Sequence, residues 1–382
     1  MIFKNVNAIL PKGETICDVR ICNGCITEFG EHIEQNIDEI VRDCTNKILM
    51  PGFIDTHNHG GLSKAFFHED IDLSKIMTAY ASRGTTAILP TFSCMPLSQF
   101  KSSVSRIIEF ENNKIGTKIA GIHAEGPFLN PVRGGGMIQE YIQQPSVEYF
   151  KEMYDACKGL LRIITIAPEM QGSQQVIQYA LNCGVKVSAG HTDATYDEMK
   201  SAIDNGITRA THLFNAARPI NHREPGVISA ALNDSRVNCE VICDFSHIHP
   251  ATVEMIWKQK GCKAFTMVSD YSDRNGKAAR GEGEHIVDGQ KYTVRNGVAW
   301  SETGSVLGTS NDMLVGVQNL YNIGVPLAEI AVMASENPAK AAGVFEQTGS
   351  ICVGKAADLV LLDNELCVID VYVDGCCVTK NA

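Results

Sequence analysis

The sequence has no apolar run long enough to cross a bilayer, no excess of basic residues and no short repeat or low-complexity tract. A membrane-spanning helix needs about 20 mostly apolar residues, so we expect none here. The 33 lysines and arginines are outnumbered by 44 aspartates and glutamates, which gives a net charge of −11. Nucleic acid and anionic membranes repel such a chain. Neither is therefore an expected partner, and a phosphorylated ligand would need a local basic site.

Neither a secretion signal nor a matched set of cysteine pairs is expected from the sequence. From Met1 to Val6 there is no basic region followed by an apolar segment and a small-residue cleavage site. The 14 cysteines are scattered, and neither Cys22-x-x-Cys25 nor the pair at 376–377 has a partner pair at zinc-ribbon spacing. We expect reduced, mostly buried thiols and a cytoplasmic location.

Between residues 51 and 345, short apolar runs alternate with longer segments of helical period. This alternation is typical of βαβ units and a parallel sheet. Eight strands are expected, at 53–57, 85–90, 119–124, 162–167, 185–189, 209–212, 240–243 and 264–269. Helices are expected near 70–82, 96–111, 146–158, 173–183, 196–204, 226–232 and 250–259. The predicted fold class is α/β, as a closed (β/α)8 TIM-like barrel, because short loops join the strands to crossover helices.

The two ends of the chain have a different pattern. Short β-prone runs at 3–9, 18–21 and 26–29 are broken by Gly, Pro and Asn, and strands return at 357–362 and 368–373. Asn296-Gly297 predicts a hairpin turn within 280–300, and helical sequence covers 311–343. We therefore predict one small β-sandwich module, built from residues 1–50 and 346–382, beside a barrel at 51–345.

A histidine pair stands at the end of the first predicted barrel strand, in Asp55-Thr56-His57-Asn58-His59. In an extended strand, residues i and i+2 point to the same face, so Asp55, His57 and His59 are expected to face one centre. Two histidines in a loop are more often ordinary solvated or hydrogen-bonded side chains than metal ligands. Other segments of the chain decide between these interpretations.

Seven polar residues have equivalent places in the predicted fold, because each lies at or just beyond the C-terminal end of a predicted strand. In a (β/α)8 barrel these ends converge on one mouth, where active sites are built. Each residue alone is more readily a hydrogen-bonded core or loop side chain, but their coincidence at one rim favours a functional site. The seven are His57, His59, Glu125, His191, His212, His247 and Asp270.

Glu125, His191 and His212 form the strongest candidate metal site. One carboxylate and two imidazoles suit a divalent cation such as zinc or iron, with manganese or cobalt as alternatives, and leave a position for water. A bound cation makes hydroxide available near neutral pH and polarises a carbonyl, so this set indicates hydrolysis. Asp270 is the candidate base for the water and then the acid for a departing nitrogen. Taken alone, Asp270 is equally well explained as a helix N-cap.

Seven phrases run in a fixed order from about residue 51 to residue 360. They are Pro-Gly-Phe-Ile-Asp-Thr-His-Asn-His-Gly, Glu-Gly-Pro-Phe-Leu-Asn, Gly-His-Thr-Asp-Ala, Thr-His-Leu-Phe-Asn-Ala, Arg-Glu-Pro-Gly, His-Ile-His-Pro and Gly-Lys-Ala-Ala-Asp-Leu-Val. Together they resemble the N-acetylglucosamine-6-phosphate deacetylases of the amidohydrolase superfamily. The resemblance implies a metal-dependent enzyme that removes the N-acetyl group from an N-acetylhexosamine 6-phosphate, with N-acetylglucosamine 6-phosphate as the first expectation, giving acetate and the amino sugar phosphate.

The resemblance also implies roles for single residues. It places a divalent cation at Glu125, His191 and His212 and makes Asp270 the acid/base. It leaves a second cation at His57 and His59 open, so that one or two are expected per subunit.

Substrate contacts follow from the same resemblance. The phosphate is assigned to Asn215, to the backbone at Ala216 and to Arg223 of a neighbouring subunit, which implies a homodimer. His247 is assigned to the sugar or the phosphate. Without the resemblance, Arg223 would be interpreted as half of a surface ion pair with Glu224 or another acid.

Three departures from the family surround the substrate positions rather than the cation. The family usually has a Lys/Arg-Gly-Ala/Thr-His phrase whose histidine helps to hold the acetamido carbonyl, and here the stretch at 133–137 reads Arg-Gly-Gly-Gly-Met. Phe245 stands where glycine is usual, and Tyr271 follows Asp270 where the family has a small residue. N-acetylgalactosamine 6-phosphate or another N-acyl amine is therefore an alternative substrate. A catalytically silent metal-binding scaffold is an alternative of another class.

Overall fold

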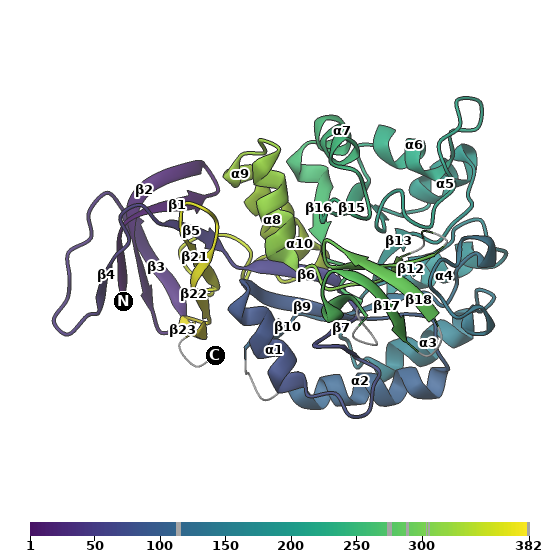
Figure 1. Cartoon of the computed structure of the whole chain (residues 1–382), viewed down its shortest axis with the longest axis horizontal. Helices are drawn as coiled ribbons and strands as arrows, with labels where there is room; N and C mark the ends of the chain where they lie inside the picture. Colours follow the sequence, from purple (N-terminus) through teal and green to yellow (C-terminus); the bar gives the residue numbers. More distant parts are fainter. Residues whose placement is uncertain (112–115, 273–276, 288–289, 303, 305, 380–382) are drawn as a thin grey trace.

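The computed structural model describes residues 1–379, apart from 112–115, 273–276, 288–289, 303 and 305. A sheet that holds both chain ends lies beside a barrel of strands surrounded by helices (Figure 1). Among the described helices, none combines the length and the apolar character that a bilayer crossing requires.

Eight parallel strands form the barrel wall. They are β6 (Phe53–Asn58), β9 (Thr85–Phe92), β11 (Ile122–Glu125, preceded by the short β10, Lys118–Ile119), β12 (Leu161–Ile166), β13 (Lys186–Ala189), β14 (Arg209–Ala210), β15 (Asn238–Ile242) and β16 (Phe265–Val268). Each strand pairs in parallel with the next. The first and last strands meet where Asp270 N–H donates to His57 O at 3.0 Å. The predicted TIM-like barrel is confirmed.

Helices cover the outside of the barrel (Figure 1). They are α1 (Leu73–Ser82), α2 (Leu97–Glu111), α3 (Val147–Ala156), α4 (Ser173–Asn182), α5 (Tyr196–Asp204), α6 (Gly226–Asn233), α7 (Pro250–Lys260), α8 (Met313–Asn322), α9 (Leu327–Ala331), a π-helical turn (Val332–Glu336) and α10 (Asn337–Ala342). The apolar faces of α1 to α9 share one core with the strands, and the buried alanines of α10 form two smaller clusters with strand residues. Local sequence fixes their starts: the side chains of Asp72, Ser146 and Asp312 accept a first-turn N–H, and Thr195 and Glu198 form a capping box.

Smaller elements follow two of the barrel strands. The hairpin of β7 (Gly60–Gly61) and β8 (Lys64–Ala65) comes directly after His59. An antiparallel sheet follows β16, with strands β17 (Gly283–Val287), β18 (Gln290–Arg295), β19 (Val298–Ser301) and β20 (Val306–Thr309). Asn296 and Gly297, at φ of 51° and 71°, form the predicted hairpin turn between β18 and β19.

The two chain ends build one module, as predicted. Its strands are β1 (Ile2–Leu10), β2 (Gly13–Cys22), β3 (Cys25–Gly30), β4 (Val41–Asp43), β5 (Ile48–Pro51), β21 (Leu359–Leu362), β22 (Val368–Val373) and β23 (Cys376–Cys377). They form a mixed sheet in the order β23-β22-β21-β5-β1-β2-β3, with β4 beside β1. The sheet has its own apolar core, where the rings of Phe3 and Tyr372 are 5.1 Å apart. The boundaries at residues 50 and 345 stay predictions, and residues 380–382 lie outside the described part of the chain.

Candidate active site

Six of the predicted residues converge at the mouth of the barrel. They come from β6 and the loop after it, from the end of β11 and from the first residues beyond β13, β14 and β16. All but one have side chains at most 6 % exposed, and the exception is Asp270 at 19 %. They form two groups whose ligand atoms lie within 4.8 Å of one another: Glu125, His191 and His212, and His57, His59 and Asp270.

The first group is the predicted set of carboxylate and imidazoles. Glu125 Oε1 lies 3.0 Å from Nε2 of His191 and 3.0 Å from Nε2 of His212, and the two nitrogens are 3.1 Å apart. The backbone at His191 and His212 has φ of 47° and 27°, a region that residues with a Cβ rarely occupy. Such strained conformations gather at functional sites, where they aim a side chain. Here they turn both imidazoles toward Glu125.

The second group faces the other side of Glu125. His57 Nε2 and His59 Nε2 are 3.2 Å apart, and Asp270 Oδ1 lies 3.5 Å and 3.3 Å from them. Glu125 Oε1 is 3.4 Å from His57 Nε2, and Glu125 Oε2 is 3.2 Å from His59 Nε2. Glu125 therefore lies between the two groups and contacts every imidazole in them.

The imidazoles have the orientation that a metal ligand needs. His191 Nδ1 lies 2.9 Å from the carbonyl oxygen of Arg133, so this nitrogen carries the proton and Nε2 presents a lone pair. His57 Nδ1 faces a carboxylate oxygen at 2.7 Å, and His59 Nδ1 faces Ser93 Oγ at 3.2 Å. His212 Nδ1 is buried without a partner among the described residues. In their neutral forms, His191 and His57 thus carry the proton on Nδ1 and direct a free Nε2 into the centre.

The donor set fits a pair of divalent cations. In tetrahedral geometry, two nitrogens that each bind zinc at about 2.0–2.1 Å are roughly 3.3 Å apart. The observed Nε2 separations of 3.1 Å and 3.2 Å match that edge. The two groups are therefore consistent with a binuclear metal site.

Charge at the centre is strongly coupled. Burial opposes ionisation, but His57, His191 and His212 hold the pKa of Glu125 well below its usual range. Burial likewise opposes the charge of His57. Three carboxylates nevertheless hold the pKa of His57 well above its usual range, namely Asp270, Glu125 and Glu240. The centre thus attracts positive charge. A divalent cation supplies this charge when it replaces the proton on His57, because a ligating imidazole must be neutral.

His247 lies near this centre. Its Nδ1 is 2.8 Å from Asp244 Oδ2, and its backbone N–H donates to Asp244 Oδ1 at 2.9 Å. Burial lowers the pKa of His247, but the hydrogen bond to Asp244 and the charge of Asp270 raise it above the usual value. Phe245, in the place where the family has glycine, has φ of 60°.

Two of the predicted phosphate contacts also lie at the mouth. Asn215 Nδ2 donates to the carbonyl oxygen of His212 at 3.3 Å. A Cβ built on Gly135 would be 3.6 Å from Ala216 Cβ and 3.5 Å from His191 Cε1, which places the glycine stretch directly over this corner.

Arg223, the third of these residues, is exposed on the loop before α6. Its backbone N–H donates to Asn221 Oδ1, and within the described part of the chain no carboxylate pairs with its guanidinium. The ion pair with Glu224 is thus not formed.

One expectation from the sequence is wrong. Asp55 does not face the centre with His57 and His59, because four donors already occupy its carboxylate. These are Ser269 Oγ at 2.5 Å, Asn58 Nδ2 at 3.0 Å, and the N–H groups of Ser269 and His57 at 3.2 Å and 3.3 Å. Asp55 instead joins the first barrel strand to the last, just below the mouth.

Glu240, the third carboxylate near His57, was not predicted from the sequence. Glu240 is fully buried on β15, and its neighbours in the strand are apolar. A signal was present, because a charged residue in a strand buried on both faces requires a buried partner. The identity of that partner was not readable from the sequence, since His57 is 183 residues away.

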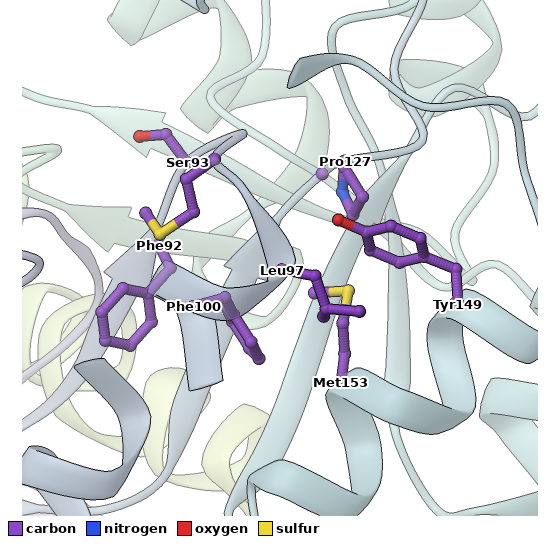
Figure 2. A pocket seen from close by; sticks show the side chains of 9 residues that line it. Phe92, Ser93, Leu97, Phe100, Pro127, Tyr149 and Met153 are labelled. Atoms are coloured by element: carbon purple, nitrogen blue, oxygen red, sulfur yellow. The ribbon is translucent and has the colours of Figure 1, made fainter. Parts of the chain in front are cut away.

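An apolar pocket lies beside the site, lined by the end of β9, the start of α2, and α3 (Figure 2). Phe92, Phe100 and Met153 line it together with Ser93, whose Oγ lies 3.2 Å from Nδ1 of His59. Its volume of about 10 Å³ holds no more than one water. A sugar phosphate therefore does not bind in this pocket.

The amidohydrolase family profile matches residues 48–378. The chain belongs to the amidohydrolase family. It is 31% identical over 378 residues to the N-acetylglucosamine-6-phosphate deacetylase of Bacillus subtilis strain 168, covering 97% of this chain and 94% of that protein. It is 30% identical over 360 residues to the N-acetylgalactosamine-6-phosphate deacetylase of Escherichia coli O157:H7, covering 94% and 93%.

A solved structure supports the same relationship for this amidohydrolase. It is an aspartate-to-alanine variant of N-acetyl-D-glucosamine-6-phosphate deacetylase from Mycobacterium smegmatis, in complex with N-acetyl-D-glucosamine-6-phosphate. The two folds superpose with a TM-score of 0.88 at 28% identity, over 99% of both chains. The resemblance inferred from the sequence phrases is confirmed.

Proposed function

We propose that this amidohydrolase removes the N-acetyl group from N-acetylglucosamine 6-phosphate, giving acetate and the free amino sugar phosphate. The observation that carries the proposal is the position of Asp270. It is the most exposed residue of a centre that otherwise consists of buried ligands, so it alone combines contact with the cation site and access from the mouth.

Each residue of the centre has a place in this reaction. Glu125, His191 and His212 hold a divalent cation, which when bound lowers the pKa of water and polarises the amide carbonyl. Burial acts to raise the pKa of Asp270, but the larger combined effect of His57 and His59 lowers this pKa below its usual value. The carboxylate of Asp270 is therefore ionised at neutral pH. Asp270 accepts the proton of the attacking water and passes it to the departing nitrogen.

We further infer that zinc or iron occupies the first group, with manganese or cobalt as alternatives, and that His57 and His59 hold a second cation. The active assembly is a homodimer in which Arg223 reaches the substrate phosphate of the neighbouring subunit. The exposed and unpaired guanidinium of Arg223 supports this role, because its planar fork suits a phosphate dianion. Asn215, the backbone of Ala216 and His247 complete the sugar phosphate site.

N-acetylgalactosamine 6-phosphate is a second candidate substrate. The relative from Escherichia coli is named for that sugar and is nearly as similar to this chain as the relative from Bacillus subtilis.

A substrate panel tests the proposal. Protein stripped with a chelator and reloaded with zinc, iron(II), manganese or cobalt is given N-acetylglucosamine 6-phosphate, its galactosamine epimer and unphosphorylated N-acetylglucosamine, and acetate is measured. We expect acetate from at least one phosphorylated sugar, none from stripped protein, and much slower release from the unphosphorylated sugar. No acetate with any cation, at full metal content, would remove the proposal in favour of a silent scaffold.

A further inference from the structure

One carboxylate outside the two ligand groups touches a member of each. Glu240 Oε1 lies 2.7 Å from Nδ1 of His57, and the same oxygen accepts the backbone N–H of His212 at 3.2 Å. The imidazole rings of His57 and His212 stack above it, 5.5 Å apart and 29° from parallel. Glu240 therefore contacts the second group through a side chain and the first group only through the backbone.

The other oxygen of Glu240 faces a buried cation. Arg209 Nη2 on the neighbouring strand β14 donates to Glu240 Oε2 at 3.4 Å, and Arg209 is only 4% exposed. A buried ion pair is expensive to desolvate, and apolar residues of similar size often stabilise a core equally well. Stability alone therefore does not explain this ion pair, whereas the hydrogen bond from His57 to Glu240 gives the buried carboxylate a role at the metal centre.

The geometry defines what that hydrogen bond does. A carboxylate accepts only, so His57 donates from Nδ1, and once the ring is neutral its Nε2 lone pair points toward His59 and Asp270. Carboxylates that hold a ligating histidine in this way fix its tautomer and orientation and strengthen its bond to the metal. No equivalent side-chain contact joins Glu240 to Glu125 or to the His191 ring within the described residues.

We propose that Glu240 is a positioning residue that sets the occupancy of a second cation at His57, His59 and Asp270. This inference rests on the metal centre of the proposed function. It concerns cation binding, however, and is decided without any measurement of turnover.

The test compares Glu240→Gln with the wild type by counting cations. Stripped protein is titrated with cobalt, and the cobalt bound per subunit is measured by elemental analysis together with the dissociation constant of each step. The wild type binds two. In Glu240→Gln, which keeps the shape but loses the charge, the first step is unchanged and the second weakens about 10- to 100-fold. The electron paramagnetic resonance signal of two coupled cobalt ions fades in parallel, leaving that of one isolated ion.

Two further variants control the comparison. Glu240→Asp retains the charge at a longer distance and gives an intermediate second step, so the proposal is still tested if the glutamine variant does not fold. Asp358→Asn removes another buried carboxylate, paired with Lys118 and hydrogen-bonded to Thr348 in the β module, and leaves both steps unchanged.

Several results would overturn the proposal. They are an unchanged second step in Glu240→Gln, an equal weakening of both steps, or a wild type that binds one cation only. None of these results removes the deacetylase proposal, which is decided by acetate release from protein that holds its first cation.

Discussion

At the scale of single residues, Asp270 belongs to the second group and is the most exposed residue of the centre. We predict that Asp270→Asn lowers kcat by about 100- to 10,000-fold, because an amide cannot accept the proton of the attacking water. The cation held by Glu125, His191 and His212 remains, while the second cation is weakened. Acetate release and elemental analysis of the same preparation separate the two effects. Full activity at full metal content would rule out the acid/base role, and Asp374→Asn, at an exposed turn of the β module, serves as the unaffected control.

The residues of the site were largely predictable because their positions depend on topology. In a barrel, the ends of all eight strands reach one mouth, so Glu125, His191 and His212 could be grouped from their places in the chain. Side-chain direction depends on distant partners and could not be predicted. Asp55 has the right spacing to join His57, yet Ser269, 214 residues away, turns its carboxylate aside.

At the scale of elements, the barrel strands and their helices were predictable to within a few residues, because apolar periodicity follows burial. The π-helical turn at Val332–Glu336 was not predicted. It depends on tertiary contacts such as the hydrogen bond from Ser335 Oγ to Pro51 O, at 3.3 Å. The sheet of β17 to β20 was predicted only at its Asn296-Gly297 turn, since that turn is its one strong local signal.

The β module contains a pH-sensitive carboxylate. Asp18 on β2 accepts from Lys4 Nζ at 2.7 Å, Asn5 N–H at 3.0 Å and Ile33 N–H at 2.9 Å. Burial raises the pKa of Asp18, but these donors lower it below its usual value. Because the pKa is lower in the folded state, the stabilisation is present above the unfolded pKa near 4 and is lost as the pH falls through the folded pKa.

We therefore predict that Asp18→Asn lowers the free energy of unfolding at neutral pH by about 1–3 kcal/mol. The difference from the wild type shrinks as the pH is lowered below about 4. Urea unfolding followed over this range measures it. Asp38→Asn is the matched control, because Asp38 is exposed and asparagine tolerates its φ of 64°. The same loss of stability at both ends of the pH range would contradict the assignment to the ionised carboxylate.

At the scale of the whole molecule, the module and the barrel are joined by charged as well as apolar contacts. Lys118 on β10 pairs with Asp358 at 2.6 Å and with Asp374 at 2.9 Å, so the barrel wall is fixed to the C-terminal strands. The union of the chain ends was predictable from the return of strand patterns after residue 346. A homodimer stays a prediction, since only the family resemblance suggests it.

Subunit mixing tests whether Arg223 acts across a dimer. Arg223→Ala alone removes the phosphate contact and raises KM for the phosphorylated sugar, and Asp270→Asn alone removes the acid/base. In a mixed dimer, the subunit with Arg223→Ala keeps its own Asp270 and receives Arg223 from its partner, so one complete site forms. Coexpression at equal levels makes half of the dimers mixed, each with one working site of two, and activity returns to about a quarter of the wild-type value. If Arg223 acts within its own chain, every site in the mixture lacks one residue, and coexpression restores nothing beyond the average of the two single variants.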